Sequence, residues 1–139
     1  MRPPEKVLSE LVEQWAAKAE LDYRAAGRLL EGEDPIREAV AFHCQQASEK
    51  YLKTFLVSRQ IEFPKTHNMR LLLDLVAGVA PEMAESLAGA AILTPYGVDI
   101  RYPGDFPEVI PGQETVLYEL AGRVRTVVTT VLKPGHAGR

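Results

Sequence analysis

Hydrophobic residues recur every three or four positions along most of the chain, which is the period of an amphipathic helix. This spacing predicts one long helix at about residues 5–31, with Gly32 just beyond its end. Asp34 and Pro35 suit the N-cap and the first position of a second helix. The pattern extends that second helix to Gln60.

Shorter patterns follow the second helix. Pro64 interrupts the periodicity, and Thr66 is expected to cap a third helix at about 69–78. A fourth helix is expected at about 82–94, resuming after a proline through 98–100.

The last part of the chain predicts a long loop and a final helix. Residues 101–112 are too rich in proline and glycine for regular structure, and the final helix ends before Lys133. Its apolar stripe consists of Val116, Leu120, Val124, Val127, Val128 and Val131. Since no alternating strand pattern stands out, the prediction is an all-α, up-and-down bundle of four to five helices. It forms a single domain over 1–133, with a flexible tail at 134–139.

Composition narrows the class of protein. The chain has 139 residues and one cysteine, Cys44, so an internal disulfide and a zinc site built on paired cysteines are both excluded. The three histidines lie on separate predicted elements, and neither a metal nor a cofactor is expected. No apolar run approaches a membrane span and no signal peptide opens the chain, which favours a cytoplasmic protein that avoids membranes. The net charge of −3 argues against a duplex-DNA binder but allows a local basic patch.

The second predicted helix carries the candidate chemistry. At about 100° per residue, half of its circumference is apolar and includes Cys44, which is therefore expected in the core. A narrower polar stripe contains His43, Gln46, Glu49, Lys50 and Lys53. Apolar residues, namely Ala39, Phe42 and Val57, interrupt this stripe, which predicts a covered surface rather than a solvated one.

Two interpretations of the polar stripe stay open. In the first, its side chains bond to neighbouring helices or to solvent; Glu49 and Lys53, four apart with the acid first, have the favourable order for an ion pair. In the second, the stripe is a ligand or partner face, where Lys50 and Lys53 contact phosphate and the glutamines donate and accept hydrogen bonds.

The second helix also carries a family resemblance. Residues 42–53 (FHCQQASEKYLK), 66–69 (THNM) and 101–105 (RYPGD) closely resemble the HEPN domain family, named for higher eukaryotes and prokaryotes nucleotide-binding. The resemblance begins near residues 15–23 and covers nearly the whole chain. It implies a helical bundle that is usually a homodimer and that often acts beside a small nucleotidyltransferase in a toxin–antitoxin pair.

Other family members are metal-independent ribonucleases, which carry an Arg followed after four to six residues by a His late in the bundle. Arg101 lies in that region, but the next histidine is His136 in the tail, so the late motif is missing. Arg37 and His43 match the spacing. Six helical positions rotate the two side chains apart by about 240°, so this match is interpreted as coincidence.

The remaining candidates have a structural and a functional interpretation each. His67 could fix the start of the third helix or transfer a proton, and Arg101 could bridge a carboxylate or bind phosphate, while Tyr102 is expected to pack. The ligand- or partner-binding candidates are Gln46, Glu49, Lys50, Lys53, His67 and Arg101. The sequence thus favours a subunit that binds a nucleotide, RNA or a partner protein. The alternative is a ribonuclease in which His43 or His67 and Arg101 assist attack by the 2′-hydroxyl.

Overall fold

The computed structural model describes residues 4–97 and 103–133. Within these ranges every regular element is helical, and no strand occurs, so the all-α prediction is confirmed. The elements are α1 (Glu5–Leu30), α2 (Arg37–Ser58), α3 (Met69–Ala77), α4 (Pro81–Ser86), the 3₁₀ helix η1 (Ala88–Tyr96) and α5 (Gln113–Leu132).

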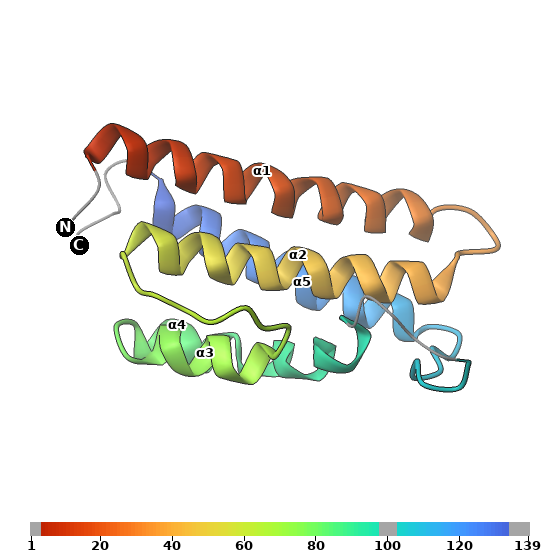
Figure 1. Ribbon diagram of the computed structural model, residues 1–139. Helices are drawn as coiled ribbons and strands as arrows, with labels where there is room; N and C mark the ends of the chain where they lie inside the picture. The colour runs from red at the N-terminus through yellow and green to blue at the C-terminus, as the bar shows by residue number, and fades with distance from the viewer. Residues whose placement is uncertain (1–3, 98–102, 134–139) are drawn as a thin grey trace.

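Helix α2 lies at the centre of the bundle. Figure 1 shows α1 along one side of α2, α5 along another, and α3, α4 and η1 together on a third. Helix α1 runs opposite to α2, whereas α5 runs in the same direction as α2. Because it is enclosed on several sides, α2 is buried along most of its length and supplies the largest buried side chains, Tyr51 and Phe55. Cys44 is fully buried, as predicted.

The long helices lie close to their predicted ranges, but two predicted boundaries are wrong. The N-cap of α2 is Ile36, not Asp34, and Pro35 lies outside the helix. Helix α2 ends at Ser58, because Gln60 has a positive φ of 57°, which no continuing α-helix allows.

Helix α3 begins where predicted, but Asn68 caps it. The Asn68 side chain accepts hydrogen bonds from the backbone N–H groups of Arg70 and Leu71, at 2.9 and 3.3 Å. Thr66 instead accepts a hydrogen bond from the Asn68 N–H at 3.0 Å. Thr66 therefore shapes the turn that presents the capping residue.

The expected fourth helix is two shorter pieces. Helix α4 ends at Ser86, and η1 continues in the tighter 3₁₀ form through Pro95. Gly89 and Pro95 are both poor α-helix formers, which accounts for the change of helix type. The expected continuation at 98–100 lies outside the described residues.

Helix α5 packs through a slightly different face from the one predicted. Leu117, Ala121, Val124 and Val128 are fully buried, whereas Val116 is 51% exposed. The spacing of these buried residues defines one face of α5. Val116 precedes Leu117 by one residue and therefore points about 100° away from that face. The final stretch, 134–139, lies outside the described residues.

Gly97, just after η1, packs against the side chain of Gln45 on α2. A Cβ at Gly97 would lie 2.2 Å from Cδ of the fully buried Gln45. Gln45 cannot move aside freely, because its amide donates to Glu49 and to the carbonyl of His67 and its oxygen accepts from Gln46.

We therefore expect Gly97→Ala to lower the free energy of unfolding by about 1–3 kcal/mol, the usual range for overpacking. Chemical denaturation followed by circular dichroism measures the loss. Gly89→Ala is the matched control, because its Cβ would meet only Leu120 at an ordinary 3.7 Å. Equal stability of the two variants would contradict the predicted collision.

Candidate functional site

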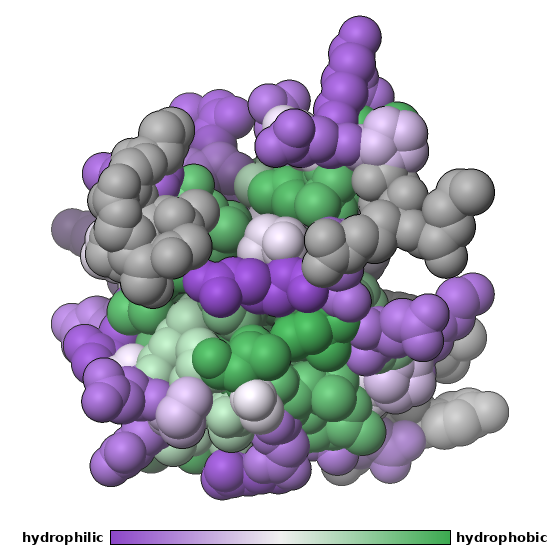
Figure 2. Space-filling view, turned by 90° about the vertical axis from the view of Figure 1, so that its left-hand side faces the viewer, coloured by the Kyte–Doolittle hydropathy of each residue, from purple (hydrophilic) through white to green (hydrophobic). Residues whose placement is uncertain are grey.

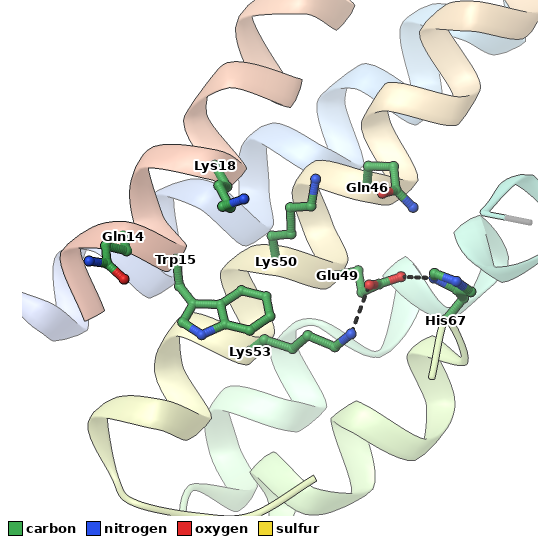
Figure 3. Close-up of a pocket in the computed structure, with 8 residues that line it drawn as sticks. All are labelled: Gln14, Trp15, Lys18, Gln46, Glu49, Lys50, Lys53 and His67. Atoms are coloured by element: carbon green, nitrogen blue, oxygen red, sulfur yellow. Dashed lines mark hydrogen bonds and ion pairs between the residues drawn. The ribbon is translucent and has the colours of Figure 1, made fainter. Parts of the chain in front are cut away.

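The polar stripe of α2 forms one wall of a cavity between α1 and α2. The cavity measures about 390 Å³ and is drawn in Figure 3. Its lining includes five residues predicted from the sequence: Gln46, Glu49, Lys50 and Lys53 from α2, and His67 from the segment before α3. The sixth predicted binding residue, Arg101, lies outside the described residues, as does Tyr102.

Helix α1 supplies the opposite wall, which the sequence pattern did not predict. Gln14, Trp15 and Lys18 line the cavity from α1. Their positions, separated by one, three and four residues, lie on neighbouring faces of one helix. Trp15 is the only tryptophan of the chain and is partly buried. Its position in the first amphipathic helix was the one feature of the sequence that could have indicated a role for α1 in the site.

Glu49 is the centre of the hydrogen bonds beneath the cavity. Its carboxylate is 3% exposed and accepts hydrogen bonds from Lys53 at 2.9 Å and from Gln45 at 3.0 Å. Nδ1 of His67 lies 2.8 Å from Oε1 of Glu49. Burial by itself raises the pKa of Glu49, but the hydrogen bonds from Lys53, Gln45 and His67 outweigh burial, so this pKa lies below its ordinary value.

Lys53 is a buried cation held by oxygen atoms and aromatic rings. It is 7% exposed, and its ammonium group also donates to the carbonyl of Thr66 at 3.0 Å. The ammonium lies 5.8 Å from the ring centroid of Trp15 and 5.6 Å from that of Phe63, within the range of cation–π attraction. Lys53 therefore has a fixed position at the cavity without help from a ligand.

The segment 59–68 is held against α2 near its end, where Lys53 of the stripe and the buried Gln45 bind backbone carbonyls. The carbonyl of Thr66 accepts from Lys53, and the carbonyl of His67 accepts from Gln45 at 3.2 Å. These bonds satisfy buried polar groups on both sides. The polar side chains of the stripe all bond within the chain, and all of them except His43 also border the cavity.

The cavity has a surplus of positive charge. Lys18, Lys50 and Lys53 line it, whereas Glu49 is the one carboxylate of the lining. Glu49 pairs with Lys53, and Asp22, just outside the lining, pairs with Lys50, so Lys18 supplies the surplus. Lys18 is exposed and forms no hydrogen bond or ion pair with another described residue. Together with the ring of Trp15, this lining suits an anion that carries a flat apolar group.

The chain was compared with models of protein families, with curated proteins and with solved structures. The family model for the HEPN domain matches residues 12–133. The chain belongs to the HEPN domain family. No match was found among curated proteins or solved structures. The matched range includes every residue that lines the cavity between α1 and α2.

The two described histidines of this HEPN domain have different surroundings. His43 lies outside the cavity, with Nδ1 2.8 Å from Oδ1 of Asp22 on α1. The other carboxylate oxygen of Asp22 accepts from Lys50 at 2.5 Å. Arg37 donates to Glu114 on α5 at 3.2 Å, so the Arg37 and His43 side chains bond to different helices, as the helical rotation predicts.

A second cavity lies at the end of the bundle where α1 begins and α5 ends. It measures about 490 Å³, and Figure 2 shows hydrophobic atoms there on both sides of a hydrophilic band. Its floor includes Phe55 and Met83, and Arg59 lies over the Phe55 ring at 4.9 Å. With one cation and one carboxylate, Glu82, it lacks the positive surplus of the first cavity.

Neither a metal site nor a membrane helix is found in the part of the chain that the structure describes. No group of three or more His, Cys, Asp or Glu side chains there could hold a metal ion. None of the described helices is long and apolar enough to span a membrane.

We expect Glu49→Gln to destabilise the protein by about 3 kcal/mol near pH 7, because Lys53 would stay buried without its counter-charge. Since the pKa of Glu49 is lowered by folding, its stabilising effect is present at neutral pH and is lost as the pH falls below about 4.5. Denaturant unfolding at pH 7 and at pH 3 measures the loss of stability caused by Glu49→Gln above and below this range. The exposed Glu62→Gln is the control, and a loss for Glu49→Gln independent of pH would refute the charge-based explanation.

Proposed function

We propose that this HEPN protein is a binding subunit that takes a nucleotide, or the phosphates of RNA, into the cavity between α1 and α2. In this proposal it acts as a homodimer beside a minimal nucleotidyltransferase, in a pair of the toxin–antitoxin type. The observation that carries the proposal is the convergence of three lysines on one cavity with an aromatic wall. At about 390 Å³ the cavity lies within the usual range for small-molecule sites.

Each part of the cavity suits a different part of a nucleotide. Lysine ammonium groups serve as point charges for phosphate oxygens, and an indole ring offers a surface on which a base stacks. Because Glu49 and Thr66 already hold the Lys53 ammonium group, a ligand has little entropy to lose in ordering it.

The three lysines differ in how readily they can reach a ligand. A phosphate must compete with Asp22 for Lys50, whereas Lys18 has no described partner to release. Lys18 is therefore the residue that tests binding with the least disturbance of the fold.

We expect Lys18→Gln to weaken nucleotide binding roughly tenfold, the scale of one charge-assisted hydrogen bond, and the Lys18→Gln/Lys50→Gln pair to weaken it further. Isothermal titration with AMP, ATP and a short single-stranded RNA at low salt measures this. Lys6→Gln, an exposed lysine of α1 that does not line the cavity, is the control. The proposal fails if wild-type protein binds none of these ligands, or if Lys6→Gln is as damaging as Lys18→Gln.

The partnership with a nucleotidyltransferase has a separate test. A nucleotidyltransferase reading frame directly beside this gene, whose product copurifies with this protein, supports the pairing. Absence of complex formation between the two purified neighbours would reject it.

The pairing of Asp22 with His43 favours one alternative, a metal-independent ribonuclease. A carboxylate on Nδ1 orients an imidazole so that Nε2 can accept a proton from the 2′-hydroxyl of RNA. If this alternative holds, the protein cleaves tRNA or mRNA in EDTA, and His43→Ala abolishes the cleavage. No cleavage, or cleavage that survives both His43→Ala and His67→Ala, would exclude it.

A further inference from the structure

Helix α1 carries a row of outward-facing residues at alternating spacings of four and three. We name this row the α1 seam: Val7, Leu11, Gln14, Lys18, Leu21, Ala25 and Arg28. Such spacing is that of the a and d positions of a coiled coil, in which two helices pack along their lengths.

The hydrophobic members of the seam are exposed. Val7 is 43%, Leu11 40% and Leu21 62% exposed. The buried face of α1 is a different one, marked by the fully buried Ala19 and Ala26. Large hydrophobic residues exposed elsewhere in the described chain lie on other elements and do not form a row along one helix: Ile36, Val79, Ile92, Ile110 and Val116.

The seam also contains a hollow of the shape that such packing needs. Leu21, Arg24, Ala25 and Arg28 line a depression of about 250 Å³ on α1. Their positions are i, i+3, i+4 and i+7, the four residues that form a hole for a side chain of a facing helix.

The exposed charges of α1 divide between its two halves. In the first half, Glu5, Glu10 and Glu13 are exposed together with a single cation, Lys6; in the second half, Lys18, Arg24 and Arg28 are exposed. The acidic residues of the second half have partners inside the bundle: Glu20 bonds to Arg125, and Asp22 bonds to His43 and Lys50. The outer surface of α1 therefore runs from acidic to basic along its length.

We propose that α1 packs antiparallel against α1 of a second copy through the α1 seam. The proposal rests on the homodimer included in the proposed function and names its interface. Antiparallel pairing places the acidic half of each helix against the basic half of the other, whereas parallel pairing would set like charges against each other. The partner is thus a second copy of this chain, because its own charge pattern is the complement required.

The pattern also fixes the register. A twofold axis near residue 16 pairs Leu11 with Leu21 of the second copy and puts Val7 of the second copy into the hollow beside Ala25. Gln14 then faces Lys18 of the second copy at the centre, where a polar pair helps to select register. Each contact occurs twice, as twofold symmetry requires.

This interface adjoins the cavity. Gln14 and Lys18 belong both to the α1 seam and to the cavity lining. The second copy therefore lies at the rim of the cavity, and ligand binding and dimer formation influence each other.

Sedimentation equilibrium from 1 to 100 µM tests the interface. We expect the wild type to be a dimer and Leu11→Glu/Leu21→Glu to raise the dimer dissociation constant roughly 30-fold or more. Both residues are exposed in the monomer, so thermal unfolding should show a folded variant. Ile92→Glu, at an exposed residue of η1, is the control and should stay dimeric.

Cross-linking with a short bis-maleimide tests the direction of pairing. Leu11→Cys and Leu21→Cys proteins should cross-link when mixed, and neither should cross-link alone. Cys44 does not interfere, because it is fully buried and burial raises the pKa of its thiol to about 12.

The outcomes separate this inference from the proposals on which it rests. Cross-linking of either variant alone indicates parallel pairing and overturns the inference. A dimer that neither cross-links nor responds to Leu11→Glu/Leu21→Glu uses another surface and also overturns it, while homodimerisation stands. A monomer at 100 µM overturns both the interface and the homodimer. Nucleotide titration, measured separately, decides the cavity proposal.

Discussion

The buried carboxylate of Glu49 is the interaction on which the cavity side of the bundle depends. It neutralises Lys53 and orients Gln45, and these two side chains bind the carbonyls of Thr66 and His67. The extended segment before α3 is thereby held against α2, and Asn68 follows at once to cap α3. One carboxylate thus links the buried charge of Lys53 to the segment that leads into α3, and Lys53 would lose its counter-charge without it.

This arrangement explains how a helix with a polar stripe can lie at the centre of the bundle. A buried polar row is tolerable only if each group is bonded, and here backbone carbonyls and neighbouring side chains supply the partners. The same residues therefore serve the fold and border the cavity. Lys18 is an exception, because it is exposed and bonds to no other described residue.

The sequence predicted the features that depend on local spacing. Helical periodicity located the long helices, placed Cys44 in the core and showed that the stripe on α2 is covered. It could not show that Trp15 and Lys18 face that stripe, since this depends on how α1 is rotated against α2. The cap at Asn68, rather than Thr66, and the 3₁₀ form of η1 depend on turn geometry and tertiary contacts such as the bond from the Met69 N–H to Thr94.

The positions of the charged side chains explain more about the cavity and the outer surface of α1 than the net charge of the chain does. The chain has a net charge of −3, yet three lysines meet at one cavity and the outer surface of α1 changes from acidic to basic along its length. At physiological ionic strength charges act over about 8 Å, so each of these local patterns acts separately from the whole. Lys18 belongs to both patterns. In the proposed dimer it faces the neutral Gln14 of the second copy, so no carboxylate compensates the charge of Lys18. That charge is then available to an anion in the cavity.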